Sequence, residues 1–151
     1  MTEGTGPYLP SGLPIPVAES DGLSEPFWTG LQKDRLLIQR CSKCRTWQFG
    51  PEWLCHICHS FDLDWVEVEP KGRIFSWERV WHASHGALSN HLPYLVVLVE
   101  LPQAGNVRLV GNLLGDARRE VKIGSAVEGY FEHRPDAKRP YTLLQWRCCQ
   151  P

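Results

Sequence analysis

The sequence predicts a mainly β protein, in which an extended arm, a short helix and a zinc ribbon precede a five-stranded barrel of the OB-fold type. One observation is a pair of C-x2-C knuckles, separated by ten residues, in the first half of this 151-residue chain. The other is a series of five short segments with strand-like composition and glycine-marked turns. We expect the arm at 1–23, the helix and ribbon at 24–69, the OB-fold at 70–147, and a tail at 148–151.

The expected arm is rich in proline and glycine, which favour neither helix nor strand. Its apolar residues Leu9, Leu13, Ile15 and Val17 leave two alternatives open. The arm lies along a surface of this chain or of a partner, or it is disordered.

A short helix is expected to begin after Ser24, which can act as its N-cap, and to end at about Asp34. Phe27, Trp28 and Leu31 recur at helical spacing within it. An aromatic pair on so short a helix usually packs against something outside the helix. The alternatives are the apolar side of the ribbon itself, and a lining for an acyl chain or a partner surface.

The two knuckles supply four thiolates, from Cys41, Cys44, Cys55 and Cys58. A strand over 36–39 leads into the first knuckle, Gly50 and Pro51 supply the turn between the knuckles, and the second knuckle is expected on the next strand. Four thiolates complete the tetrahedral coordination that zinc prefers in a structural site and leave no position for water or substrate. The sequence therefore predicts one structural zinc ion.

Two alternatives to the four-cysteine zinc site remain. His56 and His59 flank the second knuckle and could replace a cysteine as ligands. A pair of disulfides is also conceivable, but cysteines at this spacing bridge poorly outside redox motifs, and no signal peptide is expected from the first residues.

The barrel is expected to use five antiparallel strands, at 72–81, 94–101, 107–113, 126–133 and 141–146. The first of them alternates, which places Ile74, Ser76 and Glu78 on one face and Phe75 and Trp77 on the other. Residues 114–122, where many OB-folds carry a helix, are too few and too charged for a long one, so the barrel should be abbreviated there.

Composition limits the functional classes. No apolar run approaches the ~20 residues that cross a bilayer, so we expect a soluble, cytoplasmic protein with no membrane partner. The formal net charge is −1, from 16 basic and 17 acidic side chains, which gives no overall field to attract nucleic acid.

No catalytic set stands out in the sequence. Cys148 and Cys149 lie almost at the C-terminus, where a rigid site is hard to build, and we expect buried or loose thiols there. The loop with His82, His85 and His91 is the nearest competitor, because three histidines could bind a metal or move protons. Histidines so spaced in a glycine-containing loop are more often solvent-facing or interface groups.

Taken in order, several of these motifs resemble the DUF35 family over residues 25–147. The resemblance rests on Pro26 to Trp28, Leu31, Leu36 to Cys44, Pro51 to Cys58, Gly72 to Ser76, Pro93 to Leu101 and Gly124 to Glu128. Arg45 stands where the family often has glycine, and the histidine loop matches no family motif. The resemblance implies a rubredoxin-like zinc ribbon followed by an OB-fold, with an acyl-CoA association.

The resemblance also implies a partner role. DUF35 proteins generally occur with thiolase-superfamily enzymes, in which the thiolase-fold subunit carries the nucleophile and the acid/base groups. The expected function is therefore that of a subunit with no catalytic residues of its own, which binds acyl-CoA and forms a hetero-oligomer with a thiolase or a thiolase-like aldolase.

Coenzyme A requires cations for its phosphates and an apolar wall for its other parts. Basic residues cluster in the sequence around the helix and the first knuckle. The expected acyl-CoA or partner contacts are Phe27, Trp28, Lys33, Arg40, Lys43 and Arg45. An ordinary solvated charge cluster is the alternative for each basic residue.

A function from another class stays open. Zinc ribbons and OB-folds also bind single-stranded nucleic acid through aromatic platforms and basic grooves, and Phe75, Trp77 and Trp81 would be the platform here. The absence of a net positive charge argues against it. A third alternative is an assembly scaffold that contacts no ligand.

Overall fold

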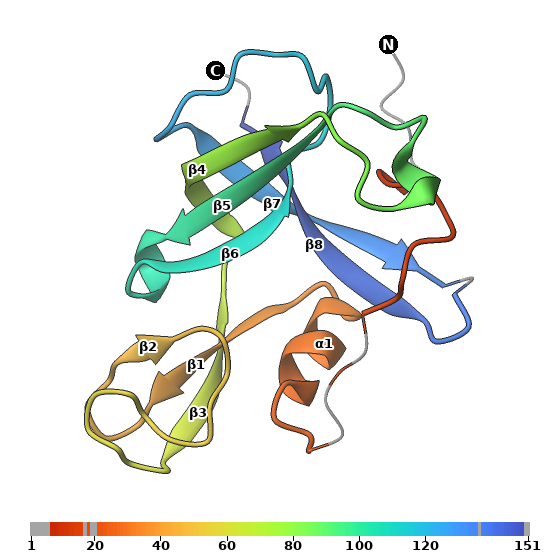
Figure 1. Ribbon diagram of the computed structural model, residues 1–151. Helices are drawn as coiled ribbons and strands as arrows, with labels where there is room; N and C mark the ends of the chain where they lie inside the picture. Colours follow the sequence, from red (N-terminus) through yellow and green to blue (C-terminus); the bar gives the residue numbers. More distant parts are fainter. Residues whose placement is uncertain (1–6, 17, 19–20, 136, 150–151) are drawn as a thin grey trace.

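The structure is a computed structural model, and it describes residues 7–16, 18, 21–135 and 137–149. A five-stranded barrel forms the upper part of the molecule in Figure 1, and a small three-stranded sheet and one helix lie side by side beneath it. The fold is therefore mainly β with one short helix, as predicted. Among the described helices, none is long and apolar enough to cross a membrane.

Helix α1 spans Glu25–Leu31 and ends earlier than the predicted boundary at about Asp34. The chain turns back at this point, because the Arg35 amide donates to the Gly30 carbonyl at 3.0 Å. Gly30 makes this approach possible, since a Cβ there would lie 2.9 Å from the Arg35 carbonyl oxygen. Ser24 occupies the N-cap position, but its side chain makes no capping hydrogen bond.

The small sheet contains strands β1 (Leu36–Cys41), β2 (Trp47–Gln48) and β3 (Leu63–Val68) in the order β2-β1-β3. Both pairs are antiparallel. The first knuckle follows β1 as predicted. The prediction that the next strand carries the second knuckle is wrong: Cys55 and Cys58 lie in the loop between β2 and β3.

The barrel contains the five predicted strands, each with ends within two residues of the expected ones. They are β4 (Lys71–Val80), β5 (Tyr94–Leu101), β6 (Val107–Asn112), β7 (Ala126–Arg134) and β8 (Tyr141–Cys148). The order is β6-β5-β4-β7-β8, and a parallel bridge between Leu113 and Trp146 brings the edges together. This arrangement is the expected OB-fold. Residues 114–122 form no long helix, as predicted.

The alternation predicted for the first barrel strand is wrong beyond Ile74. A bulge between Ile74 and Ser76 inserts an extra residue into β4 where it pairs with β5. Ile74 is buried and Trp77 packs against the same core, whereas Phe75 is 41% exposed. The bulge therefore changes which side chains of β4 face the barrel interior.

The described part of the N-terminal arm is bonded to the barrel at Tyr8 and Leu9. Nη2 of Arg134 donates to the Leu9 carbonyl at 2.9 Å, and the Tyr8 amide donates to Glu132 at 3.3 Å. Arg134 also donates from Nε to Glu132 at 2.7 Å, so a largely buried ion pair anchors the arm. Val17 lies outside the described residues.

Trp146 fills the centre of the barrel and is fully buried. Gly111 on the neighbouring β6 leaves room for the indole, because a Cβ at Gly111 would lie 2.9 Å from Cδ1 of Trp146 and 2.7 Å from the Leu144 carbonyl oxygen. The packing of β6 against β8 therefore depends on the large indole of Trp146 lying opposite Gly111, which has no side chain.

We expect Gly111→Ala to lower the free energy of unfolding by about 1–3 kcal/mol, because the added methyl group overpacks this contact. Gly86→Ala is the matched control, since a Cβ added at Gly86 would meet nothing within 4 Å. Urea denaturation of both variants measures the difference. Equal stability of the two variants would contradict this account of barrel closure.

Candidate functional site: a thiolate cluster and an apolar pocket

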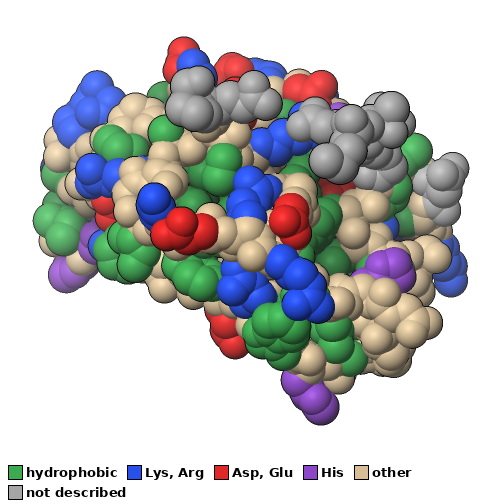
Figure 2. Space-filling model, turned by 90° about the horizontal axis from the view of Figure 1, so that it is seen from above, with side chains coloured by type: hydrophobic (Ala, Val, Ile, Leu, Met, Phe, Trp, Pro, Cys, Tyr) green, Lys and Arg blue, Asp and Glu red, His purple; other side chains and the backbone are tan. Residues whose placement is uncertain are grey.

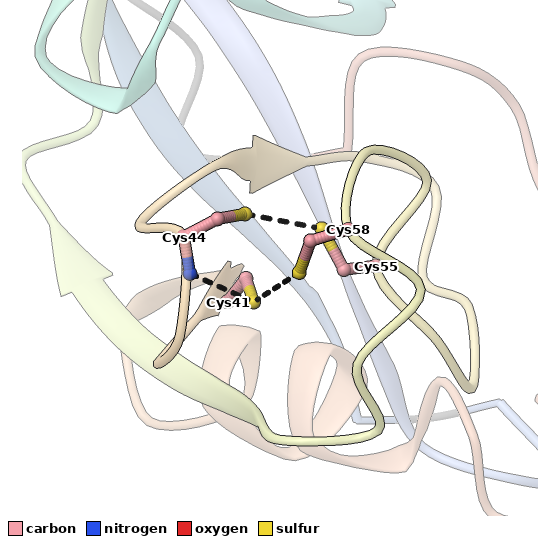
Figure 3. Close-up of side chains that lie close together, drawn as sticks. All are labelled: Cys41, Cys44, Cys55 and Cys58. Atoms are coloured by element: carbon pink, nitrogen blue, oxygen red, sulfur yellow. Dashed lines mark hydrogen bonds between the residues drawn. The ribbon is translucent and has the colours of Figure 1, made fainter.

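Four cysteine sulfurs meet at the end of the small sheet (Figure 3), and all lie within 4.8 Å of one another. Sγ of Cys41 lies 3.6 Å from Sγ of Cys58, and Sγ of Cys44 lies 3.5 Å from Sγ of Cys55. A tetrahedral zinc ion with Zn–S bonds of about 2.3 Å holds its sulfurs about 3.8 Å apart. The cluster therefore has the spacing of a zinc site, and its cysteines form no disulfide.

The two knuckles close with the same backbone geometry. The Arg45 amide donates to the Cys41 carbonyl at 2.9 Å, and the His59 amide donates to the Cys55 carbonyl at 2.9 Å. Arg45 and His59 both have left-handed backbones, with φ of 67° and 57°. This conformation favours glycine, so Arg45 and His59 each adopt a backbone that is uncommon for residues with a side chain.

Neither histidine beside the second knuckle belongs to the cluster. Nδ1 of His56 lies 3.1 Å from Oε1 of Gln48, and His59 is exposed at the left-handed turn. Among the described residues, the four cysteines are the group of potential metal ligands whose ligand atoms lie close together. They fit one structural zinc ion, which would fix the loops of the ribbon and present no open position for substrate.

Hydrogen bonds with neighbouring residues and between the sulfurs shift the pKa values of Cys44 and Cys58 in opposite directions. Hydrogen bonds with the side chain and backbone of Thr46 lower the pKa of Cys44 to about 6. A backbone hydrogen bond with Ser60 lowers the pKa of Cys58, but desolvation and hydrogen bonds to the other three sulfurs outweigh it and raise that pKa to about 11. A metal binds thiolates and must displace the remaining protons, so its affinity should fall as the pH falls.

Two buried glutamines that the sequence analysis did not single out hold the loop of the second knuckle. Gln39 accepts from the Glu52 amide at 2.9 Å and donates to the Glu52 carbonyl at 3.1 Å. Gln48 donates to Gln39 at 3.0 Å and to the Leu54 carbonyl at 3.3 Å. Nothing in the sequence indicated that Gln39 and Gln48 have this role, because a polar residue in a ribbon is ordinarily exposed.

An apolar pocket of about 440 Å³ lies between α1, the loop after β2, and the barrel. Phe27 and Trp28, which the sequence predicted as ligand or partner contacts, both line it. The ring centroid of Phe27 lies 5.3 Å from that of Trp28 and 5.3 Å from that of Phe49. The remaining lining residues are Leu31, Val96, Leu109, Val110, Gly111, Asn112, Leu143, Leu144 and Gln145.

The polar groups in this lining are already engaged. Oε1 of Gln145 accepts from the Asn112 amide at 2.7 Å, and its Nε2 donates to Glu132 at 3.1 Å. Nδ2 of Asn112 donates to the Leu95 carbonyl at 3.1 Å. The pocket therefore offers mainly apolar surface, and its volume lies within the ~300–1,000 Å³ range of small-molecule sites.

The four basic residues predicted with Phe27 and Trp28 do not line the pocket. Arg40 places its guanidinium 4.7 Å from the ring centroid of Trp47 and donates to the Arg45 carbonyl at 3.1 Å. Lys43 and Arg45 are exposed on the first knuckle, and Lys33 lies in the turn after α1. The structure thus divides the six predicted contact residues among the pocket, the turn after α1 and the ribbon.

A series of hydrogen-bonded side chains joins the barrel to the turn after α1. No sequence motif indicated it. Nδ1 of His133 lies 2.9 Å from Oγ1 of Thr142, and Nε2 lies 2.7 Å from Oδ1 of Asp34. Hydroxyl, imidazole and carboxylate are the groups of a nucleophile, a base and an orienting acid. Thr142 is only 1% exposed, however, so its hydroxyl is closed to a substrate, and the series fixes the turn against the barrel.

The remaining candidates from the sequence stay apart from the cluster and the pocket. His85 uses Nδ1 to accept from the Ala87 amide at 3.2 Å, and with His82 and His91 it forms no metal-binding group among the described residues. Cys148 is part of β8 and partly buried, whereas Cys149 is exposed.

The predicted aromatic platform for nucleic acid is partly occupied. A guanidinium lies over each ring: Arg108 over Phe75 at 3.5 Å, Arg79 over Trp77 at 5.3 Å, and Arg118 over Trp81 at 5.2 Å. On the face shown in Figure 2, basic side chains stand beside acidic and apolar ones.

The charge of Arg108 is also partly neutralised. Glu100 bonds Arg73 at 2.7 Å and Arg108 at 3.1 Å, and the hydrogen bond from Arg73 is the largest cause of the lowered pKa of this carboxyl. The outer face of the barrel thus pairs two of its cations with one anion, which weakens its attraction for a phosphate backbone.

Comparison with known proteins identifies the family. Residues 28–64 match the rubredoxin-like zinc ribbon domain of ChsH2, and residues 65–132 match its C-terminal OB-fold domain. This chain belongs to the ChsH2 (DUF35) family. The resemblance seen in the sequence is therefore confirmed, and the boundary between the two matches falls within β3.

Three relatives of this DUF35 chain are informative. A probable enoyl-CoA hydratase alpha subunit from Thermomonospora curvata is 41% identical over 116 residues, which cover 76% of this chain and 35% of that protein. This chain thus spans about a third of that relative's length. A solved structure described as an Ltp2-ChsH2(DUF35) aldolase is 33% identical, with a TM-score of 0.75, over 89% of this chain and 98% of that chain.

The third relative is a DUF35 protein of unknown function from Sulfolobus solfataricus. It is 18% identical, with a TM-score of 0.56, over 84% of this chain and 85% of that chain. At this identity the likeness shows the fold alone. The ribbon and barrel therefore persist in the DUF35 family when most side chains have changed.

We expect purified DUF35 chain to contain one zinc ion, and Cys55→Ser to lose it and unfold the ribbon, because structural zinc contributes on the order of 10 kcal/mol to the folding of small zinc domains. Elemental analysis and proteolysis measure both effects. Cys149→Ser, at an exposed cysteine outside the cluster, is the control and should keep its zinc.

The zinc should also dissociate as the pH is lowered, since protons compete for the thiolates. Wild-type protein with neither zinc nor iron would contradict the metal site. Equal metal content in the two variants would contradict the ligand role of Cys55.

Proposed function

We propose that this chain is a cytoplasmic accessory subunit that forms a hetero-oligomer with a thiolase-fold partner and supports its acyl-CoA chemistry without supplying catalytic groups. The partner would be a thiolase or a thiolase-like aldolase. The single observation that carries the proposal is the apolar pocket between α1 and the barrel, in a protein whose metal ligands form a closed cluster.

The pocket supports the acyl part of this proposal by its chemistry. Its walls are aromatic and aliphatic, and its amide groups are already hydrogen-bonded within the protein. A ligand that suits such a site is a hydrocarbon chain or ring system, because a polar ligand would lose its hydrogen bonds to water and gain none. The acyl group of an acyl-CoA meets this requirement.

The solved relative supports the partnership. That structure is described as an aldolase of Ltp2 and ChsH2(DUF35), and it matches nearly all of this chain. The curated relative carries the name of an enoyl-CoA hydratase subunit, which also concerns CoA esters. We infer that catalysis takes place on the partner, with this subunit holding part of the substrate.

Catalysis on another subunit is consistent with the described side chains. The four clustered thiolates form a set that one zinc ion would saturate, and the Thr142 hydroxyl beside His133 is buried. Neither group can attack a bound thioester as placed. This subunit would instead act by positioning substrate and by excluding water from its apolar part.

We expect the chain alone to turn over no acyl-CoA, and its complex with a thiolase-fold subunit to do so. The probes are the Ltp2 subunit of the solved relative and the thiolase-type protein encoded nearest to this chain's own gene. Co-purification tests assembly, and thiolysis and retro-aldol assays test activity. Robust turnover by the isolated chain would overturn the accessory role, and failure to bind either probe would overturn the partnership.

The pocket has its own test in the reconstituted complex. We expect Val96→Trp, which fills the pocket, to weaken binding of dodecanoyl-CoA by about tenfold or more and to leave acetyl-CoA affinity unchanged, since ~0.8 kcal/mol is lost per methylene group that leaves an apolar site. Ile123→Trp, at an exposed position outside the pocket, is the control. Titration calorimetry measures each affinity. Unchanged binding of dodecanoyl-CoA to Val96→Trp would remove the pocket from the acyl site.

A further inference from the structure

The second knuckle exposes a group of large apolar side chains. Trp53 is 55% exposed, Leu54 38%, Ile57 61% and Phe61 76%. These four residues, which we call the knuckle patch, account for half of the eight large exposed hydrophobic side chains in the described part of the chain. They flank Cys55 and Cys58 in the sequence, in the loop between β2 and β3 of the ribbon, which lies beneath the barrel in Figure 1.

The fold itself does not require the knuckle patch. None of its four residues belongs to the hydrophobic core or packs against it. The thiolate cluster and the bonds from Gln39 and Gln48 already determine the course of the loop. Several large apolar side chains exposed in one short loop and outside the core are typical of an interaction surface.

A basic surface adjoins the knuckle patch. Lys43 and Arg45 are exposed on the first knuckle and form no salt bridge within the described residues. The sulfurs of the two knuckles lie 3.5–3.6 Å apart, so the two surfaces are neighbours. An aromatic and aliphatic centre beside a charged rim is the usual composition of a protein–protein interface.

We propose that the knuckle patch, with Lys43 and Arg45 at its rim, is the surface that docks the thiolase-fold subunit. The matching surface on the partner is an apolar hollow with carboxylates at the edge that meets the first knuckle. This proposal rests on the proposed function and adds which part of this chain makes the contact. It also gives Lys43 and Arg45 a role at the partner interface, remote from the apolar pocket.

A protein partner fits the patch better than a nucleic acid. Leu54 and Ile57 have no aromatic face on which a base could stack. The solved relative, which matches 98% of its chain to this one, is described as an assembly with a different protein, Ltp2. This favours a heterologous partner over a second copy of this chain.

The size of the patch indicates its share in binding. Aromatic side chains bury about 150–250 Å² each, so Trp53 and Phe61, both more than half exposed, present on the order of 250 Å² of apolar surface. A stable interface covers about 800 Å² per partner. The patch is therefore the energetic centre of a larger contact, and its two aromatic residues should dominate the dissociation rate.

The two halves of the surface predict different responses to substitution. With the same two probes, Ltp2 of the solved relative and the thiolase-type protein encoded nearest to this chain's gene, Trp53→Ala with Phe61→Ala should weaken binding about 100-fold at any salt concentration, through faster dissociation. Lys43→Glu with Arg45→Glu should weaken it about tenfold at low salt and much less at high salt, mainly through slower association. Biolayer interferometry measures both rates.

Control measurements separate docking from folding. Ile123→Ala removes an exposed apolar side chain from the barrel, and it should bind like the wild type. Every variant should retain one zinc ion by elemental analysis, which shows that the ribbon is intact. A variant that keeps its full zinc content but no longer binds the partner has a defect in binding and not in folding.

The other outcomes overturn the proposal. If Trp53→Ala with Phe61→Ala binds a probe as tightly as the wild type does, the knuckle patch is not the docking surface and the partnership stands. If the wild type binds neither probe, the partnership and the docking surface both fail. If the chain alone forms dimers that this variant abolishes while partner binding persists, or if single-stranded DNA binds through the patch, the occupant is a second copy or a nucleic acid.

Discussion

The convergence of four sulfurs within 4.8 Å is the constraint on which the lower half of the molecule depends. The ribbon has strands of six, two and six residues, which are too short to enclose a core of their own. Its buried aliphatic side chains Leu36, Ile38 and Val68 belong to the core that continues into the barrel. A metal that joins the knuckles would fix the loops, and the barrel supplies the apolar contact that the sheet lacks.

The pocket arises from the way helix and barrel are joined. Asp34 and His133 tie the turn after α1 to β7, and Gln32 donates to the Pro140 carbonyl at 3.3 Å. These contacts hold Phe27 and Trp28 opposite the outer residues of β5, β6 and β8 without closing the space between them. Polar bonds at the end of α1 thus fix the position of the helix beside the apolar pocket.

Much of this architecture was predictable because its signals are local. The spacing of Cys41, Cys44, Cys55 and Cys58 determines a cluster almost regardless of the surrounding fold, and the strands of the barrel are bounded by turn residues. Features that depend on distant contacts were not predictable. The bulge after Ile74 has no sequence signature of its own, and it reversed the expected faces of β4 beyond that residue.

The residues of the candidate site likewise divide into those that the sequence predicted and those that only the fold brings together. Phe27 and Trp28 were found because an aromatic pair stands out on a short helix, whereas Val96 and Leu143 look like any strand residues until the fold brings them to the pocket. Proximity in sequence grouped Lys43 and Arg45 with the aromatic pair. β1 then carries the chain away from α1, so that neighbours in the sequence lie on separate surfaces.

The loop over 49–62 starts at the apolar pocket and ends at the knuckle patch. Phe49 lines the pocket against Phe27, and Phe61 lies on the exposed knuckle. Gln39 is hydrogen-bonded to the backbone of Glu52, which lies between these two ends. These bonds restrict independent movement of either end of the loop. Where occupancy of one surface alters the other through such a segment, thermodynamic linkage makes the effect reciprocal, with the same factor in both directions.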